Sequence, residues 1–263
     1  MEPTIHQLFD LTGRTALITG GTGYLGSSMS RALAEAGATV VVAGRDRSRC
    51  REAADRLQES SGGTHHAVQL DHLDPDSVAA GFQEALSIAG AIDILINNGN
   101  QAVGVDWTQV DAEQFQQCLG NATGYFLLGR HFRDHIVARG TTGSIIMLGS
   151  MYGVVASYPD AYEGVCPASP VAYHALKGGI IHMTRHLAAY WAVDGIRVNC
   201  LSPGPFPNER APLAMVERLC TKLPMKRMGL PHELKGAMLL LASDAGSYIT
   251  GQNLLVDGGW TAW

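Results

Sequence analysis

The feature that most constrains the fold of this chain is a regular alternation of short apolar runs with longer helical patterns. The apolar runs, rich in Val, Ile and Leu, occupy residues 15–19, 39–43, 66–70, 94–97, 144–148, 197–201 and 253–257. The helical patterns between them cover residues 25–36, 48–60, 76–89, 111–138 and 170–194. Because the runs show no polar alternation, both faces of each strand should be buried, with the helices as crossovers between parallel strands. The alternation therefore predicts an α/β protein with a doubly wound, seven-stranded parallel sheet and helices on both faces.

The chain shows no boundary that would divide it into separate domains. Its 263 residues contain no repeat, low-complexity segment or polar linker, and the only long stretches without clear strand or helix are 149–170 and 202–212. One domain over residues 1–263 is therefore expected, since single α/β domains reach about 250 residues. Ligands of such sheets bind outside the carboxyl ends of the strands, so the loops after strands are the candidate sites.

Composition and charge argue against several classes of function. Lys and Arg number 19 against 24 Asp and Glu, a net charge of −5 without a basic stripe, so nucleic acid is not expected as a partner. No apolar run is long enough to span a membrane, and the first residues lack the pattern of a signal peptide, so a cytoplasmic protein is expected. The five cysteines include no CxxC pair, and the pairs His131/His135 and His182/His186 have no evident third ligand, so no metal site is expected.

A glycine-rich segment, TGGTGYLG at residues 19–26, lies directly between the first apolar run and the first helical pattern. In that position glycines let backbone N–H groups approach a pyrophosphate at the positive end of the helix. Gly20, Gly23 and Gly26 are the residues expected to form this turn. A tight turn without a ligand is the alternative, but the context favours dinucleotide binding.

The end of the second apolar run indicates which dinucleotide binds. A carboxylate at this position would bond the ribose 2′-OH of NAD, whereas the chain has Gly44 followed by Arg45, which admits a 2′-phosphate and pairs with it. The sequence therefore favours NADP(H) over NAD(H). Arg47 adds local positive charge, and Arg49 and Arg51 are interpreted as part of the solvated first turns of a helix.

A tyrosine and a lysine, Tyr173 and Lys177, stand at i, i+4 within the pattern at 170–194. On a helix such side chains share one face, with Cβ atoms about 5–6 Å apart. A nearby ammonium favours a phenolate, so the lysine is expected to lower the pKa of the tyrosine toward working pH. The pair is thus a candidate for acid/base catalysis, although two solvent-exposed residues without a catalytic role can have the same spacing.

Further motifs follow the strands in order. They are Asp71 after the third run, Asn97-Asn98-Gly99 after the fourth, Asn121 within NATGYF, Ser150 after GSIIMLG, Pro203-Gly204 after RVNCLS, and YITGQNLLVDGG at 248–259. Together with the glycine turn and the Tyr173/Lys177 pair, they resemble the single-domain branch of the short-chain dehydrogenase/reductases over nearly the whole chain. The resemblance implies one NAD(P)-binding Rossmann domain over 1–263, with substrate loops at about 151–170 and 205–228.

The same resemblance implies roles for individual residues. Tyr173 would be the acid/base, Lys177 would lower its pKa and bind the nicotinamide ribose, Ser150 would hold the substrate oxygen, and Asn121 would position a water for a proton relay. The cofactor contacts implied are Gly20, Thr22, Gly23, Tyr24, Leu25, Gly26, Arg45, Asp71, His72, Asn98, Tyr173, Lys177, Pro203, Gly204 and Phe206. Family members assemble through the helices corresponding to 111–138 and 173–193, so a homotetramer or homodimer is expected.

Two features depart from the family pattern. The glycines follow TGxxGxxG, the spacing of the longer epimerase and dehydratase branch, and Tyr173 lies 23 positions after Ser150, a longer gap than is usual. The added residues include Tyr158, Asp160, Tyr162 and Glu163, which could bond substrate hydroxyl groups. A loop packed by its own aromatic residues is the alternative.

The sequence therefore indicates an NADP(H)-dependent oxidoreductase that interconverts a ketone and a secondary alcohol. A small polyhydroxylated substrate, such as a sugar, polyol or sugar acid, is expected. Two alternatives stay open: an epimerase or dehydratase that retains its nicotinamide, suggested by the glycine spacing, and a non-catalytic nucleotide-binding protein.

Overall fold

Seven parallel strands form the centre of the computed structural model, which describes residues 2–263. The strands are β1 (Thr15–Thr19), β2 (Thr39–Gly44), β3 (His66–Gln69), β4 (Ile94–Asn97), β5 (Gly143–Leu148), β6 (Ile196–Pro203) and β7 (Asn253–Val256). Their order across the sheet is β3-β2-β1-β4-β5-β6-β7. The predicted doubly wound sheet is therefore confirmed, and the order reverses between β1 and β4, where ligands of such sheets bind.

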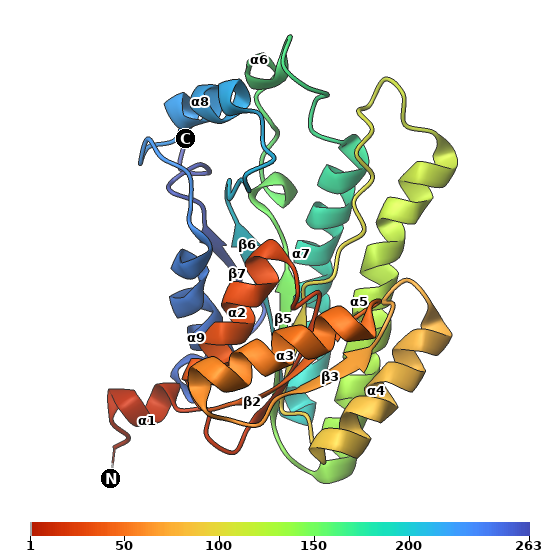
Figure 1. The fold of residues 1–263 in the computed structure, drawn as a ribbon, viewed down its shortest axis with the longest axis vertical. Helices are drawn as coiled ribbons and strands as arrows, with labels where there is room; N and C mark the ends of the chain where they lie inside the picture. Colours follow the sequence, from red (N-terminus) through yellow and green to blue (C-terminus); the bar gives the residue numbers. More distant parts are fainter. Residues whose placement is uncertain (1) are drawn as a thin grey trace.

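Helices cover both faces of the sheet (Figure 1). One face carries α2 (Tyr24–Glu35), α3 (Arg47–Ser61) and α9 (Lys235–Ala242), and the other carries α4 (Pro75–Ala89), α5 (Ala112–Arg139) and α7 (Val171–Trp191). The short α1 (Ile5–Phe9) lies near the amino end of the chain. The helix α9 is not among the helices that the sequence pattern predicts.

The uniform apolarity of the strands has a direct structural cause. In β1, Leu17 packs into the cluster under α4, α5 and α7, while its neighbours Ala16 and Ile18 pack into the cluster under α2, α3 and α9. Successive side chains of a strand point to opposite faces, and here both faces are covered. All five residues of β1 are therefore buried, whichever way they point.

Local sequence signals define the helix ends. The Asp111 carboxylate accepts a hydrogen bond from the backbone N–H of Gln114 in a capping box, which begins α5. The same helix ends at Gly140, whose φ of 62° is the left-handed conformation that glycine adopts without strain. The carboxylates of Asp46 and Asp74 accept hydrogen bonds from backbone N–H groups in the first turns of α3 and α4 and so cap these helices.

A third apolar cluster lies above the carboxyl ends of β5 and β6. It joins the segment after Ser150, including α6 (Pro159–Tyr162), to α8 (Leu213–Lys222) and to Trp260 near the end of the chain. Trp260 is the largest fully buried side chain of the described residues. We call this group of elements the upper lobe, and Figure 1 shows α6 and α8 side by side there.

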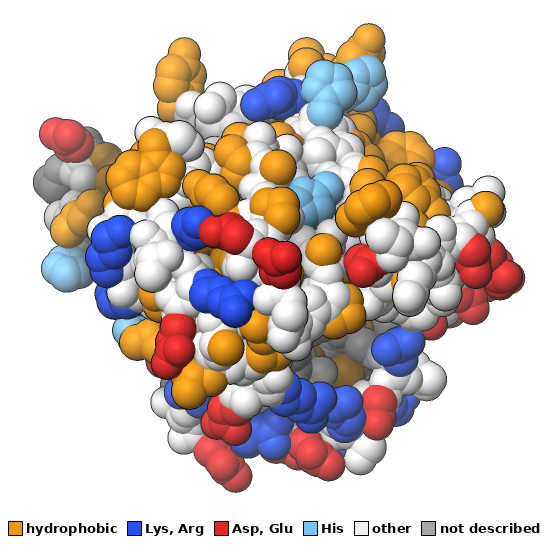
Figure 2. Space-filling model, turned by 90° about the horizontal axis from the view of Figure 1, so that it is seen from above, with side chains coloured by type: hydrophobic (Ala, Val, Ile, Leu, Met, Phe, Trp, Pro, Cys, Tyr) orange, Lys and Arg blue, Asp and Glu red, His pale blue; other side chains and the backbone are white. Residues whose placement is uncertain are grey.

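Within residues 2–263, the helices are too short or too polar to cross a lipid bilayer. Viewed from above the carboxyl ends of the strands, the surface is hollowed below its centre, with Lys and Arg side chains along the lower margin (Figure 2). Acidic side chains are interspersed among them.

Candidate active site

Two cavities lie at the carboxyl ends of the strands. The first, of about 210 Å³, is called here the glycine-turn cavity, and its lining includes Gly20, Thr22, Arg45, Asp46, Arg49, His72, Gly99 and Gln101. The second, of about 340 Å³, is called here the Ser–Tyr cavity, and its lining includes Ser150, Tyr152, Tyr173, Gly204, Phe206, Met215 and Leu219. The two cavities therefore separate eight of the predicted site residues into two groups of four.

The glycine turn is packed too tightly for larger residues. Gly20 has a φ of 63°, which other residues rarely adopt, and a Cβ on Gly26 would collide with the carbonyl oxygen of Gly20. Gly23 is the N-cap of α2 and offers no side-chain cap, so the backbone N–H groups of the first helical turn are left without an intrahelical acceptor. The turn thus has the shape that a pyrophosphate requires.

Asn98 holds this turn from the next strand. Its Nδ2 donates hydrogen bonds to the carbonyl oxygens of Thr19 and Gly20, both at 2.9 Å. Its backbone N–H donates to the Thr19 hydroxyl at 3.0 Å. The amide nitrogen of Asn98 is therefore engaged with the protein, and the side chain positions the turn.

The charges around the glycine-turn cavity differ from the predicted set. Arg45 is exposed and donates from Nη1 to Oε1 of Gln101 at 3.0 Å, and Arg49, interpreted from sequence as solvated, also lines the cavity. Arg47 instead forms a two-pronged ion pair with Glu84 on α4. Two guanidinium groups, those of Arg45 and Arg49, therefore remain beside the cavity, while Arg47 is neutralised.

The side chain of Asn121, the residue predicted to position a water, is bonded to neighbouring protein groups. Its Oδ1 accepts from the backbone N–H of Gln101 at 2.7 Å and lies 2.7 Å from Nε2 of His72, while its Nδ2 donates to the carbonyl oxygens of Gln101 and Cys118. The side chain is buried with all of these partners in place. Asn121 thus ties α5 to the loop after β4 and to His72, and burial lowers the pKa of that histidine.

Ser150, Tyr173 and Lys177 come together where β5 ends and α7 begins. Ser150 and Tyr173 line the same cavity. Lys177 is buried, with its Nζ 5.5 Å from the centre of the Tyr173 ring and donating to the Leu148 carbonyl at 2.7 Å. The hydroxyl groups of two residues thus face a common space, with an ammonium group behind them.

The electrostatics of this trio contradict one prediction. Burial raises the pKa of Tyr173 above its usual value, and the Ser150 hydroxyl opposes the shift. Burial also lowers the pKa of Lys177 to about 8. The predicted lowering of the Tyr173 pKa is wrong for this arrangement because desolvation outweighs other effects and Nζ of Lys177 lies over the ring, bonded to Leu148.

The residues expected to bond substrate hydroxyls do not line the Ser–Tyr cavity. Asp160 forms an ion pair with Lys222 at 2.6 Å, Tyr158 packs edge-on against Trp260, and the Glu163 carbonyl accepts from Arg218. The added segment is therefore packed by its own side chains against α8 and the end of the chain. Of the two interpretations of this segment, the contacts therefore favour the loop packed by its own aromatic residues, whose burial stabilises it.

Tyr152 is a cavity residue that sequence reasoning missed. It lies in the 3-10 turn Met151–Gly153, and its hydroxyl lies 2.7 Å from that of Tyr162. Its ring stacks on His174 at a centroid distance of 4.6 Å. Burial raises its pKa, so the hydroxyl is a neutral hydrogen-bonding group. The only sequence signal was its place two residues after Ser150.

The segment predicted to close over the site does contact it. Phe206 and Gly204 line the Ser–Tyr cavity, and the Tyr24 hydroxyl donates to the Pro207 carbonyl at 3.1 Å. Tyr24 thus links the start of α2 to the segment after β6. Leu25, in contrast, packs against the apolar cluster under α2.

Two further predicted cofactor contacts lie away from the cavity linings. The Asp71 carboxylate accepts from the backbone N–H of Leu73 at 3.0 Å, which shapes the turn after β3. Pro203 ends β6 and is buried. Among residues 2–263, no group of three His, Cys, Asp or Glu side chains is arranged to hold a metal ion.

The sequence of this chain is similar to those of known oxidoreductases. A family model described as enoyl-(acyl carrier protein) reductase matches residues 24–261. Galactitol 2-dehydrogenase (L-tagatose-forming) of Cereibacter sphaeroides is 35% identical, with 97% of this chain and 98% of that protein covered.

Solved structures also resemble this chain over nearly its whole length. A short-chain type dehydrogenase/reductase from Mycobacterium marinum has a TM-score of 0.90 and 32% identity, covering 99% of this chain and 100% of that one. A gluconate 5-dehydrogenase from Burkholderia cenocepacia, solved in complex with NADP and tartrate, has the same TM-score of 0.90, identity of 32% and coverage of 99% and 100%.

Proposed function

The chain belongs to the short-chain dehydrogenase/reductase family, and on that premise we propose that it interconverts a secondary alcohol and a ketone of a polyol, sugar or sugar acid with NADP(H). The observation that carries the proposal is that Ser150 and Tyr173 share one cavity with buried Lys177 behind them. The glycine-turn cavity lies at the same ends of the strands, where the strand order switches between β1 and β4.

The residues around the glycine turn fit a nicotinamide dinucleotide. Gly20 and Gly26 leave a cradle that a Cβ would fill, and the free N–H groups at the start of α2 suit its pyrophosphate. Arg45 and Arg49 at the far end of the cavity suit a 2′-phosphate. When bound, this cofactor supplies the hydride chemistry, while the protein supplies binding and orientation.

Tyr173 is the proposed acid/base. Because burial raises its pKa, the hydroxyl is protonated at neutral pH and can donate its proton to a substrate oxygen during reduction. The Ser150 hydroxyl, in the same cavity, donates a hydrogen bond to that oxygen and holds it near Tyr173. In the oxidising direction Tyr173 must accept a proton, so the oxidation rate should increase as the pH rises through the alkaline range.

Substrate class is inferred from the cavity and the relatives together. Ser150, Tyr152 and Tyr173 present three hydroxyl groups, while Phe206, Met215 and Leu219 supply apolar walls. Hydroxyl donors suit a small polyhydroxylated molecule. The relatives named for galactitol and gluconate support this class, and they favour an oxidoreductase over an epimerase or dehydratase.

Oligomerisation is also proposed, through α5 and α7. These helices leave Phe126, Val137 and Tyr190 exposed at 36%, 45% and 67%, so apolar surface on both helices is available to a second copy. Burial of these side chains against a second copy would form a dimer or tetramer. Light scattering of the purified protein measures the assembly directly, and a monomer at micromolar concentration would rule it out.

Cofactor preference is tested by fluorescence titration with NADPH and, separately, NADH. Arg45→Gln should weaken NADPH binding by about tenfold or more and change NADH binding little, because one charged hydrogen bond to phosphate is lost. Arg47→Gln is the matched control, since Arg47 is paired with Glu84 and should leave the preference unchanged. Tighter binding of NADH by the wild-type protein would contradict the NADP(H) assignment.

Catalysis is tested by screening galactitol, arabinitol, gluconate and their keto counterparts with the preferred dinucleotide. Tyr173→Phe should abolish turnover while leaving dinucleotide affinity within a few-fold, because only the hydroxyl is removed. Full activity of this variant would remove Tyr173 from the mechanism. Turnover of 2-enoyl substrates in place of alcohols and ketones would contradict the proposed reaction.

A further inference from the structure

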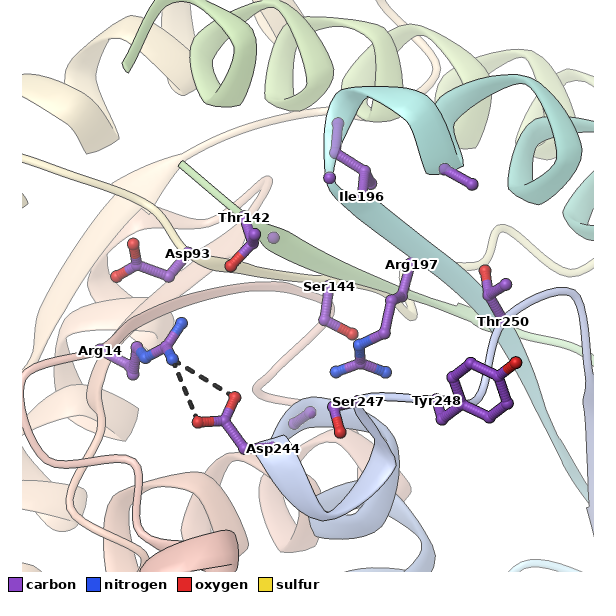
Figure 3. A pocket seen from close by; sticks show the side chains of 14 residues that line it. Arg14, Asp93, Thr142, Ser144, Ile196, Arg197, Asp244, Ser247, Tyr248 and Thr250 are labelled. Atoms are coloured by element: carbon purple, nitrogen blue, oxygen red, sulfur yellow. Dashed lines mark hydrogen bonds and ion pairs between the residues drawn. The ribbon is translucent and has the colours of Figure 1, made fainter. Parts of the chain in front are cut away.

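A third cavity lies at the opposite ends of the strands from the candidate active site. Figure 3 shows the side chains that line it. Its volume of about 550 Å³ exceeds that of either cavity described above. Its lining comes from the segments that lead into β1, β4, β5, β6 and β7, so it lies at the amino ends of these strands. We call it the amino-end cavity. Nothing in the proposed reaction uses it.

Arg197, at the start of β6, is the central charge of this cavity. Figure 3 shows its guanidinium pointing into the cavity between Ser144 and Ser247. Its partners are two backbone carbonyls, those of Ser243 at 3.1 Å and Ile249 at 3.4 Å. A guanidinium carries five N–H donors, so donors remain for a ligand. Within the described chain no carboxylate reaches ion-pair distance of Arg197.

The acidic groups nearby do not neutralise this charge. Both oxygens of Asp93 are engaged, one by the Thr15 backbone N–H and one by Arg139, each at 2.9 Å. Asp244 is held loosely by a single nitrogen of Arg14, at 3.4 and 3.5 Å, and is largely exposed. Asp93 is thus paired with Arg139, which lies outside the lining, and Asp244 with Arg14, so Arg197 is the lining cation without a carboxylate partner among the described residues.

The charge of Arg197 favours an anionic ligand in this cavity. Burial lowers the pKa of Arg197, which means that its charge is incompletely solvated, and an oxyanion would relieve that penalty. A guanidinium fork matches the paired oxygens of a carboxylate or phosphate. At the rim stands Tyr248, whose side chain is fully exposed and offers a flat face to a ring.

We propose that the amino-end cavity binds a sugar-sized organic anion, with its phosphate or carboxylate on Arg197 and Arg14 and its ring against Tyr248. The volume suits a ligand of this size, since small-molecule sites commonly measure about 300–1,000 Å³. Loose pairing lets Arg14 turn from Asp244 to the ligand at little cost. This site is separate from the active site and does not depend on the proposed function.

Calorimetric titration of the purified protein tests the proposal, with glucose 6-phosphate, glucuronate and inorganic phosphate as anions and glucose as the neutral control. The anionic sugars should bind and glucose should not. Arg197→Gln should weaken binding by about tenfold or more through loss of a charged pair. Asp244→Asn should tighten it by about threefold, because a competing carboxylate is removed from an exposed position.

Two further variants keep the test decisive. If Arg197→Gln unfolds, Ser247→Trp fills the cavity without touching the carbonyl bonds of Arg197 and should abolish binding. Arg45→Gln, at the carboxyl ends of the strands, should leave binding of the anionic sugars unchanged. Loss of binding in Arg45→Gln but not in Arg197→Gln would place the anion in the glycine-turn cavity and overturn the proposal, as would absence of binding to both the wild type and Asp244→Asn.

Discussion

The buried Lys177 should make the free energy of unfolding increase with pH in the alkaline range. Replacing Lys177 by a residue that does not titrate should remove this contribution. The ammonium is buried without an ion pair, and burial lowers its pKa from 10.5 to about 8. Between these values the unfolded chain binds more protons than the folded chain, so stability rises with pH. The penalty of burying the charge is fully present below pH 8 and disappears as the pH passes 10.5.

The size of the effect follows from the same shift. Each pKa unit corresponds to about 1.4 kcal/mol, so burial of the charge lowers the free energy of unfolding by about 3 kcal/mol at pH 7. Lys177→Met removes this penalty but leaves the Leu148 carbonyl without its donor, a loss of about 1–3 kcal/mol that does not vary with pH. The two effects are separable because only one of them titrates.

Urea unfolding of the wild type and Lys177→Met at pH 7, 8, 9 and 10 measures the difference. The stability of the variant relative to the wild type should fall by about 2–3 kcal/mol between pH 7 and pH 10. Lys226→Met is the matched control: Lys226 also donates to one carbonyl, that of Thr221 at 2.8 Å, but is exposed. A difference for Lys177→Met that stays constant with pH would refute the reasoning.

Four other substitutions test the glycine turn, α9 and the upper lobe. Gly26→Ala should destabilise the fold by about 1–3 kcal/mol and weaken dinucleotide binding, because its Cβ would strike the Gly20 carbonyl; Gly236→Ala, with open space around it in α9, should instead stabilise by about 0.5–1 kcal/mol. Trp260→Ala should lower the free energy of unfolding by about 3–5 kcal/mol and expose the segment 151–170 to proteolysis, since it empties the centre of the third cluster. Tyr162→Phe should raise the KM of the alcohol substrate about two- to tenfold with dinucleotide affinity unchanged, because Tyr152 loses its hydroxyl partner; a higher KM for the dinucleotide would show a more general disturbance.

Much of the framework could be predicted because its causes are local. Burial of both faces of a strand requires an uninterrupted apolar run, and a turn like that at Gly20 and Gly26 tolerates no Cβ. The seven predicted strands therefore match those observed to within two residues at their ends. The i, i+4 spacing likewise placed Lys177 beside Tyr173.

The partners of polar side chains could not be predicted in this way, since each depends on elements remote in the sequence. Arg47 and Arg45 are two residues apart, yet Glu84 on α4 neutralises one and Gln101 after β4 binds the other. Tyr158 and Asp160 look equally able to bind a substrate, but Trp260 and Lys222 engage them.

The sequence by itself determined the doubly wound sheet and the order of the motifs, because strand burial, helix capping and glycine turns obey rules that act over a few residues. Only the tertiary structure decided which charges remain unpaired and which hydroxyls face a cavity. The amino-end cavity shows this most clearly: it forms where five segments meet, and no single one of them carries a signal of it. Desolvation, which raises the pKa of Tyr173 and lowers that of Lys177, is likewise a property of the folded chain alone.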